Sequence, residues 1–467
     1  MFKNYLWVFL EKSGQFIIQS ISIIVLGRVL SPEDYGLYGT MMIFIAISEL
    51  LIDSGFGGAI VHKKDVKQED LNTLFVTNLS ISLVLYLIIF CVAPFIAGYY
   101  NEQKLSLYLR VFGLVIILYS LTLIHVTMLQ KELKFKLSTI IIFISSLVSV
   151  ISAFIAALYG LGVWSLVIQQ LLLSLTMVIL LKILDKRKIR FEFSKSSFHY
   201  LWGFGSKLLF ANFINTIYNN ISTSLVPKIT SMNIAGYYTQ ASKINSIPGN
   251  ILMTTIDKVT FPLLSKENNS QTLFKKAQNI NQIILVLTIP IFPIISLFSK
   301  EIIYVILGEK WIGADVFLAI LAWGGIGLLL QTIYRNIFKS LADTSTILKV
   351  DLIKTIIGLT ILGISLKLGV IFMIYGLTIS MYIGAIVYTI ILFKKFKVGI
   401  IHLISDYSLP LFVSLFIYII FYFYMRDIHF AWYNLFYALA FYFIYFLVNL
   451  LLKNKIAINI VRYLFFK

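Results

Sequence analysis

Apolar stretches of about twenty residues recur along the whole sequence of 467 residues. A helix needs about 20 apolar residues to cross the hydrocarbon core of a bilayer, and these runs lack the alternation typical of β-barrel strands. Charged residues make up 13% of the chain, against about 25% in soluble domains. The sequence therefore predicts an all-α polytopic membrane protein.

We expect about fourteen transmembrane helices, with the first apolar run retained because no small-residue cleavage site follows it. They are predicted over residues 5–29, 37–61, 72–99, 105–128, 137–158, 161–181, 202–226, 234–257, 277–299, 312–334, 346–366, 369–393, 405–425 and 430–452.

Basic residues alternate from one set of connections to the other. On this helix count, 27 of the 39 Lys and Arg residues fall on the termini and on every second connection, 7 on the opposite connections and 5 within spans. Lys and Arg accumulate on cytoplasmic loops, so both termini are predicted to be cytoplasmic. The same bias accounts for the net charge of +18 without a nucleic-acid partner.

Residues typical of metal sites and catalytic sites are sparse. Cys91 is the single cysteine, and the five histidines lie far apart in the sequence. Neither metal-ligand spacing nor a Gly-rich phosphate loop occurs. We expect no metal, no cofactor and no catalytic residue.

One phrase occurs twice. YLWVFLEK begins at Tyr5 and YLWGFGSK begins at Tyr200, with five of eight positions identical at an offset of 195. Each phrase opens a predicted helix, the first and the seventh, and each contains a lysine, Lys12 and Lys207.

A second pair of phrases follows in the same order. SPEDYGLYGT begins at Ser31 and SMNIAGYYTQ at Ser231, and they share serine, glycine and tyrosine at an offset of 200. A duplicated six-helix unit explains both pairs, and an even number of helices gives the two copies the same orientation. We predict two lobes related by a pseudo-twofold axis, residues 1–181 and 200–393. A basic cytoplasmic linker, 182–199, joins them, and residues 394–467 add two helices and a tail.

Prolines interrupt two predicted helices. Pro248 and Gly249 lie in the eighth helix, and Pro290 and Pro293 in the ninth. A proline removes a backbone donor and clashes with the preceding turn. Each position predicts either a static kink or a hinge.

The phrase SPEDYGLYG and the stretch DSGFGGAIVHKKDVKQEDLNTLF, Asp53 to Phe75, resemble the polysaccharide (O-antigen, Wzx-type) flippases. These belong to the multidrug/oligosaccharidyl-lipid/polysaccharide (MOP) exporter superfamily. The similarity extends in pattern over the whole chain, including the two lobes, the basic linker and the terminal helix pair.

The resemblance implies a MATE-like fold with two lobes around a central cavity that opens alternately to each side. It implies that the first, second, seventh and eighth helices line this cavity. The implied activity is movement of an undecaprenyl-pyrophosphate-linked oligosaccharide from the cytoplasmic to the periplasmic leaflet of the bacterial inner membrane. Implied partners are that lipid-linked oligosaccharide, a polysaccharide polymerase and a chain-length regulator. Apart from the resemblance, the basic charge of the linker predicts either attraction to anionic lipids of the inner leaflet or a plain connection between the lobes.

Charged residues inside predicted spans are candidates for function, because each costs about 3 kcal/mol at the bilayer centre. A pyrophosphate needs cations, and the candidate substrate-binding residues are Lys12, Lys207, Lys243 and Arg110. Arg110 carries less weight, because it lies near a helix end and can snorkel.

Three acids complete the set: Glu11, Glu49 and Asp53. They are predicted either to bind a coupling proton or sodium ion or to form structural ion pairs. Lys12 and Asp53 both lie roughly 11 Å from the cytoplasmic end of their helices, so a Lys12–Asp53 pair is one expectation.

Two other functions compete with the flippase. A cation-coupled multidrug exporter of the same superfamily would use the membrane carboxylates. A membrane glycosyltransferase or polymerase would use an acidic pair such as Glu33 and Asp34. In the sequence SPED, however, Ser31 and these acids fit a helix N-terminus better, and the large periplasmic loop typical of polymerases is absent from the sequence.

Overall fold

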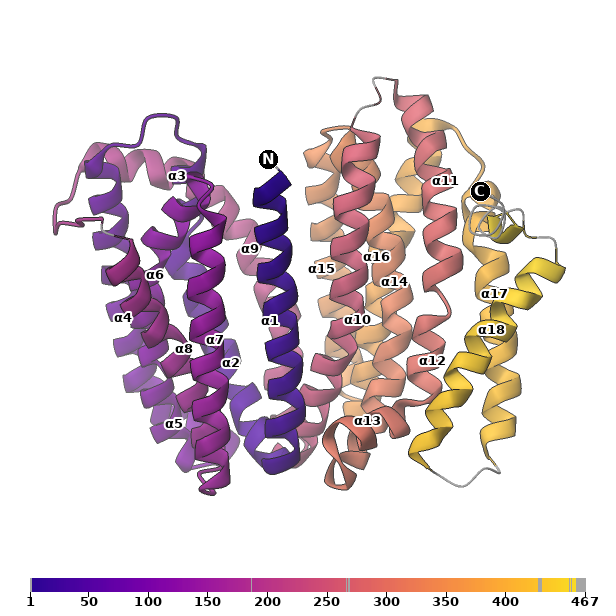
Figure 1. Cartoon of the computed structure of the whole chain (residues 1–467), viewed down its shortest axis with the longest axis horizontal. Helices are drawn as coiled ribbons and strands as arrows, with labels where there is room; N and C mark the ends of the chain where they lie inside the picture. Colours follow the sequence, from indigo (N-terminus) through magenta and orange to yellow (C-terminus); the bar gives the residue numbers. More distant parts are fainter. Residues whose placement is uncertain are drawn as a thin grey trace. The chain divides into compact units, whose positions relative to one another are not determined.

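The computed structural model describes residues 2–185, 187–265, 267, 269–426, 431–452, 454 and 456–458, and each regular element in this part of the chain is a helix (Figure 1). The chain divides into two compact units, Met1–Gly236 and Tyr237–Lys467. The division falls inside the first turns of α10.

The first unit holds nine helices among its described residues and the start of a tenth. These are α1 (Phe2–Val29), α2 (Pro32–Asp53), α3 (Phe56–His62), α4 (Gln68–Tyr100), α5 (Lys104–Phe112), α6 (Leu114–Lys131), α7 (Phe135–Leu158), α8 (Val163–Leu184), α9 (Lys195–Ile229) and the start of α10 (Met232–Leu264).

The second unit continues from α10. Its elements are α11 (Ser270–Thr288), α12 (Ile291–Leu297), α13 (Ser299–Leu307), η1 (Glu309–Ala314), α14 (Asp315–Ser340), α15 (Thr344–Leu366), α16 (Val370–Phe396), α17 (Ile400–Arg426), η2 (Trp432–Leu435) and α18 (Phe436–Leu451).

Helical structure is present at each of the fourteen predicted positions. Among the described residues, ten helical segments are long and apolar enough to cross a membrane. The four long helices outside this set are α1, α9, α10 and α15. They carry lysines at the positions the sequence places inside spans, Lys12, Lys207, Lys243 and Lys354.

Three of the predicted helices are interrupted. The fourth divides at Gly113, between α5 and α6. The second predicted helix breaks at Ser54 and Gly55, which have φ values of 45° and 70°. This left-handed turn ends α2 and starts α3. The ninth breaks at Pro290, between α11 and α12, because proline cannot donate the next helical hydrogen bond.

The compact units differ from the predicted lobes. The sequence places the seventh helix with the second lobe, but α9 packs against α2, α3 and α4 and belongs to the first unit. The compact boundary therefore follows α9 instead of preceding it. The pseudo-twofold relation between the six-helix sequences stays a prediction.

Each unit has its own apolar interior. In the second unit, α14 contributes a run of buried side chains to a core that includes Phe292, Ile333, Phe338 and Tyr388. A separate cluster around Phe298, Phe421 and Phe441 joins α17 and α18 to α12. Large apolar side chains also remain exposed on α4, α17 and α18, which is the surface expected of helices in contact with lipid.

Candidate functional site

The break between α2 and α3 positions the predicted acids. Asp53 is the last residue of α2, and the backbone N–H of Gly57 in α3 donates to its carboxylate. A negative charge is stabilised at the start of a helix. Glu49 lies one turn earlier and is half-buried. Asp53 therefore has a structural partner, although it stays half-buried rather than enclosed.

α9 crosses this break at Gly205. A Cβ atom added to Gly205 would lie 2.4 Å from the carbonyl oxygen of Ser54 and 2.8 Å from the Phe56 ring. Only glycine permits so close an approach. Lys207 is two residues further along α9, and its side chain lies outside the described part of the structure. The backbone nevertheless places its helical turn beside the acid-bearing end of α2.

Lys12 lies on the surface of α1. Its side chain is 64% exposed, and its Nζ is 3.6 Å from Oε1 of Glu11, whose side chain is 12% exposed. Thr139 of α7 approaches Glu11 Oε2 at 3.5 Å. Within the described residues, the ion pair of Lys12 is therefore with Glu11, and the predicted pair with Asp53 is not formed.

The last two predicted cations belong to other helices. Lys243 is half-buried on α10 in the second unit. Arg110 belongs to α5, where its Nε donates to the carbonyl oxygen of Phe90 at 3.1 Å and its guanidinium lies 4.4 Å from the centre of the Phe90 ring.

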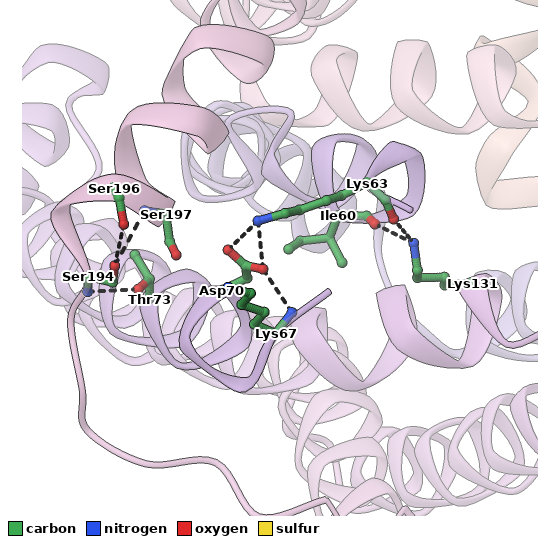
Figure 2. Close-up of polar contacts among 9 residues, drawn as sticks. All are labelled: Ile60, Lys63, Lys67, Asp70, Thr73, Lys131, Ser194, Ser196 and Ser197. Carbon is green, nitrogen blue, oxygen red and sulfur yellow. Dashed lines mark hydrogen bonds and ion pairs between the residues drawn. The ribbon is translucent and has the colours of Figure 1, made fainter. Parts of the chain in front are cut away.

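A polar network joins the start of α4 to the loop after α3 (Figure 2). Asp70 is buried, and its two oxygens lie 2.7 and 2.8 Å from Lys63 Nζ. The backbone N–H of Lys67 donates to the same carboxylate at 2.9 Å. Asp70 therefore fixes the loop and caps α4 at once.

The interlobe linker is bound along this network. Asn72 donates to Glu192 at 2.8 Å and accepts from the backbone N–H of Arg190 at 3.0 Å. Thr73 accepts from the backbone N–H of Ser194 at 3.0 Å, as Figure 2 shows. We call residues 187–197 the linker belt. Rather than a loose tether, it is a segment held by side chains of α4.

Two further cations bind groups close to the Asp70 network. Lys131 of α6 donates to the carbonyl oxygens of Ile60 and Val61 at 2.9 and 3.1 Å and also to that of Lys63. It thereby satisfies carbonyls at the end of α3. Arg187 of the linker belt forms a bidentate pair with Glu132, at 2.9 and 2.7 Å.

Arg187 also reaches a buried pair. Its Nε lies 3.0 Å from Asp185 Oδ2, which is 2.8 Å from Nδ1 of His125. The guanidinium of Arg187, with Lys134, lowers the pKa of Glu132 from 4.5 to about 2. The predicted positive charge of the linker is thus partly neutralised by acids of the first unit.

At the opposite end of the unit, the second pair of repeated phrases meets. A Cβ on Gly36 would lie 1.9 Å from the carbonyl oxygen of Met232, and a Cβ on Gly236 would lie 1.8 Å from that of Pro32. Pro32 and Met232 are themselves equivalent at the offset of 200. The starts of α2 and α10 therefore cross backbone to backbone in a reciprocal contact, which we call the glycine crossing.

The acids beside the glycine crossing form a helix cap. Ser31 Oγ accepts from the backbone N–H of Asp34 at 3.2 Å, and Asp34 accepts from the backbone N–H of Ser31 at 2.8 Å. This capping box stabilises the start of α2. The predicted capping role of SPED is confirmed.

Comparison with known proteins places this geometry in a family. A family model described as polysaccharide biosynthesis protein matches residues 25–316, which is more than half of the chain. The chain belongs to the polysaccharide biosynthesis protein family. The resemblance drawn from the phrases at Ser31 and Asp53 is confirmed.

Curated relatives of this family member are distant. The teichuronic acid biosynthesis protein TuaB of Bacillus subtilis (strain 168) is 24% identical over 323 residues, 68% of this chain and 67% of that protein. The lipopolysaccharide biosynthesis protein WzxC of Escherichia coli (strain K12) is 22% identical over 298 residues, 62% of this chain and 60% of that protein.

Solved structures establish the fold. The chain matches the lipid II flippase MurJ in an inward closed conformation with a TM-score of 0.78 and 14% identity, over 97% of this chain and all of that one. An inward-facing multidrug resistance MATE family transporter of the MOP superfamily matches with a TM-score of 0.63 and 15% identity, over 80% of this chain and 92% of that one. The fold is thus one found in membrane transporters and flippases.

The family phrase at residues 53–75 now has a physical meaning. It contains the α3 break, the Asp70 network and the Asn72 and Thr73 side chains that hold the linker belt. The polar residues of this phrase after Asp53 had no predicted role. The consecutive polar residues ahead of an apolar run were the available signal, because they exceed what one helix cap needs.

Proposed function

We propose that this protein moves undecaprenyl-pyrophosphate-linked oligosaccharide units from the cytoplasmic to the outer leaflet by alternating access. These units would serve the synthesis of a surface polysaccharide such as O-antigen, capsule or exopolysaccharide. The proposal includes fourteen membrane spans in two six-helix lobes with a terminal pair, both termini in the cytoplasm of a bacterial inner membrane, and partnership with a polymerase and a chain-length regulator.

The observation that carries the proposal is the polarity of α9. Between Lys207 and Lys228 this helix contains nine amide or hydroxyl residues: Asn212, Asn215, Thr216, Tyr218, Asn219, Asn220, Ser222, Thr223 and Ser224. A helix this polar is costly against lipid and needs a polar or hydrated surrounding. Amides and hydroxyls are the groups that hydrogen-bond sugar hydroxyls, so α9 suits the passage of an oligosaccharide.

The lysines are suited to the other half of the substrate, its pyrophosphate group. Lys12 and Lys207 bind the pyrophosphate as point charges, and Lys243 is proposed as a third cation. Glu49 and Asp53 are proposed to bind a coupling proton or sodium ion, with Glu11 tuning Lys12. Charges in a partly dehydrated path interact more strongly than in water.

A cation-coupled multidrug exporter is the second candidate. It is favoured by the half-buried Glu49 and Asp53, one helical turn apart on α2, and by the fold shared with a MATE transporter. The glycosyltransferase reading has less support, because Asp34 of the acidic pair already takes part in the capping box with Ser31.

A disrupted strain tests the choice. Loss of a flippase should abolish surface polysaccharide and cause the complete lipid-linked unit to accumulate in the inner leaflet. Re-expression of the wild-type chain should reverse both effects. Drug sensitivity with normal polysaccharide would favour the exporter, and accumulation of incomplete units would favour an enzyme.

A further inference from the structure

Pro94 and Pro290 each leave a helix carbonyl without its usual donor. Proline lacks the N–H that would bond to the carbonyl four residues earlier. Pro94 lies inside α4 and deprives the carbonyl of Phe90, and Pro290 separates α11 from α12 and deprives the carbonyl of Val286. In a membrane-spanning helix such a carbonyl must find another donor, because lipid supplies none.

In the first unit the donor comes from α5. Arg110 Nε donates to the Phe90 carbonyl at 3.1 Å, and the guanidinium also covers the Phe90 ring at 4.4 Å. The carbonyl contacted by Arg110 is thus the one that Pro94 leaves unpaired.

In the second unit the donor comes from α18. The hydroxyl of Tyr445 donates to the Val286 carbonyl at 2.9 Å, and Tyr445 is completely buried. The neighbouring Tyr442 donates to the next carbonyl, Leu287, at 2.8 Å. The terminal helix pair is therefore hydrogen-bonded to the backbone at the proline break itself.

The two prolines are related by the repeat. They are 196 positions apart, close to the offsets of 195 and 200 in the repeated phrases, and they lie in the third and ninth predicted helices. We propose that Arg110 and Tyr445 are equivalent brace residues, each replacing the hydrogen bond that a proline removes. Each holds the backbone at its proline, so the break at Pro290 is a static kink and the terminal pair is an integral support of the second unit. This assignment does not depend on the proposed function.

A double-mutant cycle at Pro290 tests the brace. Tyr445→Phe should lower the midpoint of thermal unfolding in detergent by about 1 °C, the shift expected when one interhelical hydrogen bond is lost from a chain of this length. Pro290→Ala gives the Val286 carbonyl a backbone donor. In that background Tyr445→Phe should shift the midpoint by less than about 0.5 °C. Equal shifts in both backgrounds would overturn the proposal.

Tyr382→Phe is the matched control. It removes a tyrosine hydroxyl that donates to the Trp323 carbonyl at 2.5 Å. Pro290→Ala cannot provide that carbonyl with a new donor. The shift in unfolding midpoint caused by Tyr382→Phe should therefore be the same with Pro290 and with Pro290→Ala. If this shift also disappears in Pro290→Ala, the loss seen for Tyr445→Phe is not specific to the Val286 carbonyl, and the proposal fails.

The same cycle at Pro94 separates a brace from a substrate-binding residue. Arg110→Met should reduce stability and transport in the wild-type chain but have little effect after Pro94→Ala. Lys104→Met, at the exposed start of α5, controls for loss of charge and should have little effect in either background. If Arg110→Met still impairs transport in Pro94→Ala, Arg110 acts on the substrate and the brace assignment is wrong.

Discussion

Charged residues in this protein differ in how completely their partners satisfy them. Asp70, Lys131 and Arg187 are held by several short hydrogen bonds, and such groups are committed to the fold. Among the described residues, Lys12 Nζ has two longer contacts, 3.6 Å to Glu11 Oε1 and 3.5 Å to Gln15 Oε1, and its side chain is 64% exposed. A cation held this loosely can exchange these partners for an anion, so it is the better candidate for binding one.

Replacing Lys12 or Lys207 by alanine should reduce transport without preventing folding. We expect each change to lower the initial rate about tenfold, equivalent to about 1.4 kcal/mol, and the double variant to be worse. Arginine should retain more activity, because it keeps the charge. The measurement is the rate at which surface polysaccharide reappears, normalised to protein level. Lys367→Ala, outside the spans, serves as the control.

A purely structural ion pair between Lys12 and Glu11 predicts a different result in a residue exchange. If Lys12 only pairs with Glu11, exchanging the two residues (Glu11→Lys with Lys12→Glu) should restore transport lost in Lys12→Glu. Restoration would remove Lys12 from the substrate path.

Acid should weaken the attachment of the linker belt. Arg187 lowers the pKa of Glu132 from 4.5 to about 2. A lowered carboxylate pKa stabilises the fold above the ordinary value, and this stabilisation is lost as pH falls from about 4.5 through about 2. Glu132 is one-third exposed, so we expect at most about 1 kcal/mol.

Thermal unfolding in detergent measures this effect. Glu132→Gln should unfold at a lower temperature than the wild-type chain at pH 7, and the difference should shrink towards pH 2. A difference that is independent of pH would mean that the carboxylate charge does not hold Arg187.

At the scale of helices, the length of an apolar run predicts well where a helix lies. It predicts poorly where that helix breaks and which other segments its side chains contact. All fourteen expected helices have a counterpart because each buries or faces apolar material along its length. The break at Ser54 needed a different signal, the serine–glycine turn pair. The linker belt had none, since Asn72 and Glu192 are 120 residues apart and no periodicity connects them.

The glycine crossing yields a prediction about helix packing. Gly36→Ala places a methyl group 1.9 Å from the Met232 carbonyl oxygen, so the contact must open. If transport requires this contact to close, the variant should lose at least about tenfold in rate.

Gly363→Ala is the matched control in α15, because a Cβ there meets no atom within 4 Å. It should keep full transport and gain slightly in helix stability. If Gly36→Ala restores surface polysaccharide as fully as Gly363→Ala does, the glycine crossing is not part of the transport cycle.

At the scale of the whole molecule, the sequence predicted a duplicated architecture, and the structure adds where each part packs. The repeated phrases identified Gly36 and Gly236 as equivalent positions but did not predict their contact, because the sequence does not show which backbone packs against a glycine. The packing of α9 with the first unit was also missed, since helix order alone does not decide which bundle a helix joins.

The membrane topology can be tested independently of transport. Reporters fused after Lys64 or Lys188 should score cytoplasmic, and those fused after Asn101 or Lys310 should score periplasmic. The reason is the bias of basic residues towards the cytoplasmic side. A reversed result for either pair would exclude fourteen spans with cytoplasmic termini.

The central claim is that this protein moves a lipid-linked oligosaccharide across the bilayer. The direct measurement uses purified protein in sealed liposomes containing an undecaprenyl-pyrophosphate-linked oligosaccharide, with a glycosidase added outside. We predict that cleavage proceeds from the outer leaflet to nearly the whole pool with the wild-type chain, and more slowly with the Lys12→Ala, Lys207→Ala double variant. Cleavage that stops at the outer-leaflet fraction, equal to that of protein-free liposomes, would contradict the account.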